Sequence, residues 1–358
     1  MFGAVFTALW FDRRFLAPGQ AEAAPVTTNV DPQAFDFTDA ANRVMASVVS
    51  IDTSIKQASF LGESQLIAAG SGSGVVFQAD GYIVTNAHVV RDPNFRGTVR
   101  AVDVVTVRTN SDEGYDAKVV GIDEVSDLAV IKIENASLAP ATLGDSDKLQ
   151  VGDWVMAVGN QLGFDNSVSV GVVSSKNRWL ETPDDSILID AIQTDAAINR
   201  GNSGGALCNT SGEVVGINSS IATYGGVSSG VGFAIPSSHV RRVVKEIIEN
   251  GYVKYAILGI EPATPSFSLA VPQDRVTYSI QAESPEPPNY GLVVMTSYPG
   301  LPAAKAGIKQ FDVILELGGT RVYSSIDYIR AIMEKHPGDR VEIKVWSKGE
   351  TRTLTATL

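Results

Sequence analysis

The stretch Gly201-Asn202-Ser203-Gly204-Gly205 places one serine in the middle of a glycine-rich turn. Glycine adopts backbone angles that other residues avoid, and it lets a second backbone approach closely. Acyl transfer needs such a turn, because the nucleophile must be accessible while two backbone N–H groups point at the developing oxyanion. Taken alone, the string is equally consistent with a structural serine in a tight turn, so residues elsewhere in the chain have to decide.

An imidazole and a carboxylate that could serve this serine lie upstream. His88 follows a strand-like run, and Asp127 comes directly before the apolar run Leu128 to Ile133. A serine nucleophile needs an imidazole to accept the hydroxyl proton and a carboxylate to orient the ring and stabilise the imidazolium. The order His, Asp, Ser is that of chymotrypsin and differs from the orders in subtilisin and the α/β-hydrolases. We therefore predict a catalytic triad of His88, Asp127 and Ser203.

The other histidines and the cysteine have plainer explanations. His239 lies in the first turn of an expected helix, and His336 lies at a helix C-terminus, where a positive charge is favoured by the helix dipole. Cys208, the single cysteine, lies in an apolar run and is interpreted as a small buried hydrophobic residue. No intrachain disulfide can form, so stability must come from packed cores.

Length and composition indicate a soluble chain of two or three domains. It has 358 residues, of which 44% are hydrophobic, and its formal net charge is -12. This acidity argues against nucleic acid as a partner, because phosphate binding requires a basic face. The sequence has no phosphate-binding loop, zinc-protease helix motif or Cys/His cluster, so neither ATP nor a metal ion is expected as a cofactor.

Short runs rich in Val and Ile, separated by Gly, Asp and Asn turns, extend from about Ala46 to Ile235. About a dozen such runs with hardly a helix among them predict β-barrels or a sandwich. The period then changes, and Ser237 is expected to cap an amphipathic helix that Asn250-Gly251 ends. We place the first domain at residues 35–250.

From Gly251 onward the pattern is mixed α and β, which predicts a separate small domain over residues 251–358. We expect strands at Gly291 to Met295 and Asp312 to Leu317, a helix over Ser325 to Lys335, and a hairpin across Lys348-Gly349. Residues 262–290 carry six prolines and little periodicity. They are therefore predicted to form a loop.

Residues 1–34 are expected to be an N-terminal tail and linker. The apolar run Met1 to Phe11 is shorter than the roughly 20 residues that a membrane-spanning helix needs. No basic segment precedes it, as a secretory signal would require. A truncated export signal or anchor, with small residues at Ala21-Glu22-Ala23, and a disordered tail both remain open.

Together these strings resemble the HtrA/Deg family of serine proteases. Besides the serine turn, the matching segments are Gly72 to Val76, Thr85 to Val90, Asp127 to Ile133, Ala157 to Asn160, Gln193 to Asn199 and Gly232 to Pro236. The likeness runs from about Phe35 to the C-terminus. It implies a mainly β fold: a chymotrypsin-like double β-barrel with the triad in the cleft, followed by a small α+β PDZ domain.

The resemblance also implies an oxyanion hole at the backbone N–H groups of Gly201 and Ser203, with Asn202 between them. Digestive enzymes of this fold carry Asp at that middle position and pair it with a freed N-terminus. Asn202 cannot form this ion pair, so activation by clipping is not expected. Gln161 stands where the family usually has Pro. We expect activation by rearrangement of the loops around 160–166, 176–186 and 221–230.

A hydrophobic S1 pocket, which holds the side chain before the cleaved bond, is implied by position-matching at Ile198, Ala222 and Val231. Residue 199 is Asn, whereas a pocket for Lys or Arg would need a buried carboxylate there. Cleavage after Val, Ala or another small aliphatic residue is therefore expected.

The string Leu258-Gly259-Ile260 resembles the carboxylate-binding loop of an HtrA-type PDZ domain. In such loops backbone N–H groups hold a peptide's C-terminal carboxylate, and an exposed strand edge pairs with the peptide. Pro262 lacks an N–H group and would interrupt this pairing. A PDZ domain that serves only packing or regulation therefore stays an alternative.

The resemblance implies an ATP-independent endopeptidase that hydrolyses unfolded or damaged proteins through an acyl-enzyme, under control of its PDZ domain. It further implies protein quality control under stress, in the periplasm or anchored to the membrane and facing the periplasm. Phe35 and Phe37 are placed to assemble a homotrimer, although two aromatic residues near an N-terminus could equally belong to an ordinary core. The short segment Ile55 to Gly70 resembles regulatory members with a single PDZ domain. The alternative is a non-hydrolytic chaperone or peptide-sensing protein that keeps the fold, although the complete triad favours the protease.

Overall fold

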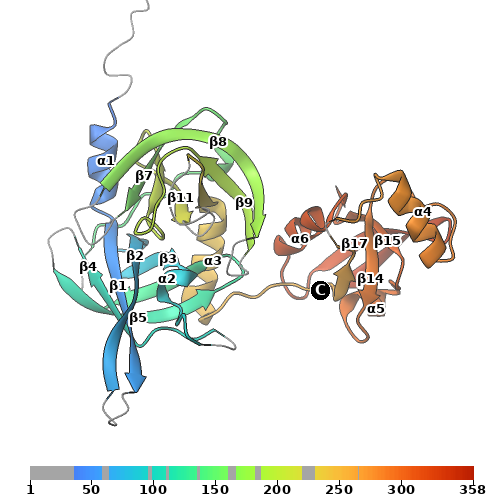
Figure 1. Ribbon diagram of the computed structural model, residues 1–358, viewed down its shortest axis with the longest axis horizontal. Coiled ribbons are helices and arrows are strands. Elements are labelled where there is room, and N and C mark those ends of the chain that lie inside the picture. The colour runs from blue at the N-terminus through green and yellow to red at the C-terminus, as the bar shows by residue number, and fades with distance from the viewer. Residues whose placement is uncertain are drawn as a thin grey trace, which may run out of the picture. The chain divides into compact units, whose positions relative to one another are not determined.

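The computed structural model describes residues 36–58, 64–95, 99–109, 113–134, 138–159, 167–181, 187–219, 230–264 and 266–358. Within these ranges two closed six-stranded β-barrels are followed by a separate sheet (Figure 1). This confirms the predicted mainly β fold, a double barrel followed by a PDZ-like domain.

The first barrel is closed by antiparallel strands in the order β1-β2-β3-β6-β5-β4. Its interior is filled by Val and Ile side chains such as Ile51, Ile83 and Ile131, none of which is exposed. Helix α1 (Thr38–Met45) precedes the barrel, and the single turn α2 (Ala87–Val90) directly follows β3. The strands are β1 Val48–Ala58, β2 Ser64–Val76, β3 Tyr82–Asn86, β4 Val104–Arg108, β5 Gly114–Asp123 and β6 Leu128–Ile133.

The second barrel is closed in the order β10-β11-β12-β9-β8-β7. Alternate residues of these strands, among them Val155, Ala157 and Leu207, form its core, as the two-residue period of a strand requires. A 3-10 turn at Ser146–Lys148 precedes it. The strands are β7 Trp154–Gly159, β8 Ser167–Glu181, β9 Ile187–Thr194, β10 Ala206–Asn209, β11 Val214–Ser219 and β12 Gly232–Pro236.

Helix α3 (Ser237–Asn250) follows the second barrel, and Gly251 ends it with a φ of 83°, which confirms the predicted stop. The predicted cap is wrong. The Ser237 hydroxyl makes no cap hydrogen bond; it donates to the Gly144 carbonyl (2.9 Å) and accepts from the Ser146 N–H (3.1 Å). Ser237 is buried and therefore serves the loop packed beside it. The expected inner face is buried at Val240, Val243, Val244 and Ile247 and half-buried at Ile248.

The C-terminal sheet has the order β13-β14-β15-β17-β18, with β16 paired to β15. The predicted hairpin is present: Lys348 and Gly349, with φ values of 47° and 93°, form its two-residue turn. Two further helices are α5 (Pro302–Ala306) and α6 (Ser325–Met333), and a capping box between Ser324 and Asp327 starts the second. The strands are β13 Ile260–Pro262, β14 Leu292–Ser297, β15 Val313–Leu317, β16 Thr320–Arg321, β17 Arg340–Ser347 and β18 Glu350–Thr357.

The loop predicted over 262–290 is wrong in part, because helix α4 spans Pro272–Gln281. Pro272 stands at the start of the helix, where its missing N–H has no cost. Tyr278 is 2% exposed, packs against Trp346 and donates its hydroxyl to the Phe311 carbonyl (2.5 Å). Contacts with distant residues thus fix this helix, and its sequence shows little helical period because Ile280 faces solvent.

Candidate active site

Two of the predicted triad side chains are in direct contact. Strands β3 and β6 pair antiparallel with Asn86 opposite Leu128, so His88 and Asp127, just beyond those strand ends, are neighbours. His88 Nδ1 lies 2.9 Å from Oδ1 and 3.0 Å from Oδ2 of Asp127. When Nδ1 carries the proton and donates it to the carboxylate, Nε2 is left as an acceptor for a hydroxyl proton.

The Asp127 side chain is held from several directions and is only 1% exposed. Its Oδ1 also accepts from the His88 backbone N–H, and its Oδ2 accepts from the Ser219 hydroxyl, each at 3.1 Å. Its φ of 55° is uncommon for a residue other than glycine. The Asp127 carbonyl accepts from the Ala87 N–H (3.1 Å) and the Asn86 side chain (3.0 Å). These contacts fix the orientation of the carboxylate toward the imidazole.

The turn that carries Ser203 is tied to the first barrel by Ser73 of β2. The Ser73 N–H donates to the Ser203 carbonyl (2.8 Å), and the Ser73 hydroxyl donates to the Gly201 carbonyl (2.6 Å). The Ser73 carbonyl in turn accepts from the Thr85 hydroxyl (2.7 Å), on the strand that leads to His88. One residue therefore connects the serine turn with the histidine segment.

Gly72 lies between the serine turn and the residue after His88. A Cβ atom placed there would be 2.8 Å from the Val89 side chain and 3.1 Å from the Ser203 carbonyl oxygen. The structure thus brings the segments of all three predicted triad residues to one place. Ser203 itself is 3% exposed.

The predicted oxyanion-hole residues form a compact turn. Gly201 has a φ of 102°, the Asn202 N–H donates to the Asn199 carbonyl (3.0 Å), and the Gly205 N–H donates to the Asn202 carbonyl (2.9 Å). The Asn202 side chain is buried and donates to the Ala197 carbonyl (3.2 Å). The amide at this position is neutral, and a backbone carbonyl accepts a hydrogen bond from its NH₂ group.

The residues predicted for the S1 pocket are only partly described. Ile198 is fully buried in the second barrel, and a Cβ on Gly232 would be 2.9 Å from its Cδ1 atom. Val231, the neighbour of that glycine, is half-buried. Ala222, Gln161 and most of the three predicted activation loops lie outside the described residues. Of the predicted S1 residues, the structure therefore describes Ile198, which lies beside Gly232, and Val231, the residue before that glycine.

Two residues of this site were not found from the sequence. Ser219, at the end of β11, donates to Asp127 from the second barrel, and Ser73 was noticed only as part of a matching string. No local pattern distinguishes these serines from others, because their partners are more than 90 residues away in the chain. Cys208, in contrast, is fully buried, which confirms its interpretation as a small buried residue; burial raises the pKa of its thiol to about 12.

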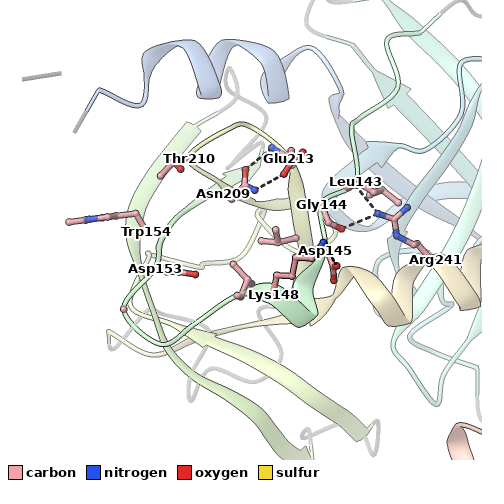
Figure 2. A pocket seen from close by; sticks show the side chains of 13 residues that line it. Leu143, Gly144, Asp145, Lys148, Asp153, Trp154, Asn209, Thr210, Glu213 and Arg241 are labelled. Carbon is pink, nitrogen blue, oxygen red and sulfur yellow. Dashed lines mark hydrogen bonds and ion pairs between the residues drawn. The ribbon is translucent and has the colours of Figure 1, made fainter. Parts of the chain in front are cut away.

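A separate hollow of about 640 Å³ lies on the second barrel, and none of the three triad residues lines it (Figure 2). Its polar groups have partners within the chain. Arg241 donates to the carbonyls of Leu143 (2.8 Å) and Gly144 (3.0 Å), and Asn209 donates to Glu213 (2.8 Å).

In the C-terminal sheet the predicted carboxylate loop Leu258-Gly259-Ile260 leads into the edge strand β13. Gly259 has a φ of 81°, and its carbonyl accepts from the Tyr298 N–H (3.0 Å). The Ala263 N–H donates to the Val293 carbonyl (2.9 Å). These two hydrogen bonds show that residues 259 and 263 face β14 on either side of an irregularity in the pairing at Glu261/Pro262. Because residues along a strand alternate in direction, Ile260 and Pro262 then face the open edge.

The paired barrels and the buried aspartate–histidine pair define the class of this chain, a trypsin-like serine hydrolase. The family described as the trypsin-like peptidase domain matches residues 72–217, and the PDZ domain family matches residues 272–358.

Among known proteins, the chain is 39% identical over 290 residues to a "Probable periplasmic serine endoprotease DegP-like" of Chlamydia trachomatis serovar D, covering 80% of this chain and 53% of the relative. A protein of the same name from Halomonas elongata is 40% identical over 287 residues, at 80% and 56% coverage. The chain thus spans about half the length of the curated relatives it matches. The solved structure "HtrA-type protease AlgW with tripeptide" is 32% identical with a TM-score of 0.71, covering 90% of this chain and 96% of that one. The chain belongs to the HtrA-type serine proteases, as its sequence predicted.

Proposed function

We propose that this chain is a serine endopeptidase whose triad is His88, Asp127 and Ser203. The observation that carries the proposal is the buried Asp127 carboxylate, 2.9 Å from His88 Nδ1, beside a serine turn that Ser73 ties to the same barrel. The Ser203 hydroxyl attacks the scissile carbonyl carbon while His88 Nε2 takes the hydroxyl proton. His88 then gives this proton to the leaving amine, and the substrate stays bound as an ester on Ser203.

The negative charge that develops on the substrate oxygen needs donors already in place. We assign this role to the backbone N–H groups of Gly201 and Ser203, on either side of Asn202. Support comes from the positive φ of Gly201 and from the hydrogen bond that fixes its carbonyl on the Ser73 hydroxyl. Water deacylates the ester with His88 again acting as the base, which restores the free serine.

The first prediction separates this function from that of a non-hydrolytic chaperone. Ser203→Ala is expected to lower casein hydrolysis by at least about 10⁴-fold and to abolish labelling by a fluorophosphonate, because the nucleophile is gone. Ser211→Ala, at an exposed turn of the same barrel, is the matched control and should leave both readouts unchanged. Hydrolysis that persists in Ser203→Ala would refute the assignment.

The second prediction concerns the residue before the cleaved bond. We propose an apolar S1 pocket that includes Ile198, Val231 and Ala222 and accepts small aliphatic side chains. The buried Ile198 and the neutral Asn199 support this, because neither offers a carboxylate to Lys or Arg. A peptide library digested by the full chain should be cut mainly after Val and Ala, and cleavage mainly after Arg would contradict the proposal.

We further propose ATP-independent hydrolysis of unfolded or damaged proteins as the task of the whole protein. The names of its relatives, serine endoproteases, support the reaction class. A sequence without a phosphate-binding loop fits a reaction that needs no ATP.

For the C-terminal domain, placed at residues 251–358 after a protease domain of 35–250, we propose binding of peptide C-termini and control of the protease. The open edge of β13 supports this, because the N–H and carbonyl of Ile260 face outward. Pro262, two residues further along the strand, has no N–H group, so only its carbonyl can accept a hydrogen bond from a bound peptide. Pairing would therefore hold the last residue of a peptide by two hydrogen bonds and its third-last residue by one.

We propose a homotrimer, assembled through the segment with Phe35 and Phe37 and through an apolar patch on the second barrel. Trp154, Val168 and Val170 of β7 and β8 are each about 40% exposed on one outer face. Helix α1, which directly follows Phe37, packs against β7. An exposed apolar face of this kind is typical of a surface that another chain covers.

We also propose an extracytoplasmic location, which is supported by the word periplasmic in the relatives' names. Within the described ranges of the chain, no helix has the length and hydrophobicity to cross a membrane.

A further inference from the structure

The chain segment that leaves α3 toward the C-terminal domain returns to the loop that carries Asp127. Tyr255 of this segment donates its hydroxyl to Oδ2 of Asp123 (2.5 Å), the last residue of β5. The same oxygen accepts from the N–H of Ser126 (3.2 Å) and from the Ser126 hydroxyl. Three donors thus meet on one carboxylate oxygen of a residue that lies four positions before Asp127 in the sequence.

The loop between Asp123 and Asp127 is a short, tightly bonded turn. Asp123 pairs with Leu128 in the last rung between β5 and β6, and the Asp127 N–H donates to the Glu124 carbonyl (3.4 Å). Asp127 leaves this turn with its left-handed φ of 55°. A residue in that conformation persists only where its surroundings hold it on both sides. His88, Asn86 and Ser219 form hydrogen bonds with Asp127 itself. Asp123 and Ser126 instead fix the turn that leads into Asp127.

Tyr255 is itself fastened in place. Its ring lies under the Arg242 guanidinium of α3, 5.6 Å from the ring centroid, and the N–H of its neighbour Lys254 donates to Glu246 (2.9 Å). At the start of the segment, a Cβ on Gly121 of β5 would lie 2.4 Å from the Gly251 carbonyl oxygen. The segment from residue 251 to 255 is therefore packed on α3 and β5 before the chain continues to the C-terminal domain.

The Asp123 carboxyl depends on these donors because it is 5% exposed. Burial raises its pKa, while the hydrogen bonds from Ser126 and Tyr255 lower it. Burial likewise raises the pKa of the Tyr255 phenol, which keeps its proton at neutral pH and donates it. Removing the Tyr255 hydroxyl leaves the buried Asp123 carboxylate without one of its hydrogen-bond donors. We expect the loop from Asp123 to Asp127 to shift so that the carboxylate finds another donor.

We propose that Tyr255 and Asp123 are positioning residues for the triad: the interdomain segment holds the loop that sets Asp127 against His88, so a displacement of this segment misaligns the catalytic acid. This inference rests on the proposed function of His88, Asp127 and Ser203. It gives the C-terminal domain a direct mechanical route to the triad, along the chain itself.

The test is Tyr255→Phe in the full chain, which removes one hydroxyl and keeps the ring. We expect kcat to fall about 3- to 10-fold with KM unchanged, as for the loss of one hydrogen bond. A misplaced Asp127 stabilises the His88 imidazolium less, so His88 loses its proton at lower pH. The acid limb of the plot of kcat against pH should therefore move to lower pH by about half a unit. Tyr252→Phe is the matched control, since Tyr252 is in the same segment and exposed. It should match the wild type in both readouts.

Asp123 provides the second arm. Asp123→Ala should show the same two changes more strongly, and Asp123→Asn should recover part of the loss because its amide oxygen still accepts from Ser126 and Tyr255. If Tyr255→Phe lowers the melting temperature below the assay temperature, the test is the comparison of Asp123→Asn with Asp123→Ala in kcat and in the acid limb. The inference is overturned if Tyr255→Phe and Tyr252→Phe have equal kcat and equal acid limbs. The proposed function is tested separately: it fails if the Ser203→Ala variant still hydrolyses casein at the wild-type rate.

Discussion

Asp127→Asn is expected to lower kcat by about 10⁴-fold with little change in KM, as the same replacement does in the template Ser-His-Asp enzymes. The carboxylate accepts a hydrogen bond from His88 Nδ1, with 2.9 Å between Nδ1 and Oδ1. An amide NH₂ in its place would donate to Nδ1, which moves the ring proton to Nε2. That tautomer cannot accept the hydroxyl proton of Ser203.

The measurement is single-substrate kinetics on a chromogenic peptide, with circular dichroism to show that the fold is kept. Asp116→Asn is the matched control, because Asp116 is an exposed residue of β5. Its kcat should equal that of the wild type. A kcat for Asp127→Asn within tenfold of the wild type would remove Asp127 from the triad.

Gly204→Ala is the second change with a large expected effect. A Cβ at this position would lie 2.2 Å from the Ser73 carbonyl oxygen and 2.3 Å from the Thr85 hydroxyl oxygen, on a backbone with a φ of 82°. The serine turn would have to move away from the first barrel. We expect hydrolysis and fluorophosphonate labelling to be lost and the free energy of unfolding to fall by about 3 kcal/mol.

A control for the backbone strain alone is Gly152→Ala. Gly152 has a φ of 98°, and a Cβ there would meet nothing within 4 Å. This variant should lose only about 1 kcal/mol of stability and keep full activity. Equal melting temperatures and equal labelling rates for the two variants would show that the close approach to Ser73 does not matter.

The fold could be predicted, and the triad proposed, because the signals for both are local. Valine- and isoleucine-rich runs predicted the strands, and His88, Asp127 and Ser203 each belong to a recognisable string. The positioning residues carry no such signal. Ser219, Ser73 and Tyr255 reach their partners across 92, 128 and 132 positions of sequence, so only the tertiary structure brings them together.

The errors have the same origin. Ser237 follows the rule for a helix cap, but a buried hydroxyl is used by the nearest loop, here Gly144 and Ser146. Helix α4 was missed because a single aromatic residue, Tyr278, fixes it against distant strands. In both cases contacts between remote parts of the chain outweighed the local preference.

Pro262 has a consequence beyond peptide recognition. Strand β13 is the edge of its sheet and is three residues long. An unprotected edge can recruit strands from other chains and start aggregation, and a protein that handles unfolded polypeptides would meet such strands constantly. A short edge that ends in proline offers no repeating row of N–H donors. Pro262 therefore limits how far a strand from another chain could pair along this edge, one of the two edges of the sheet.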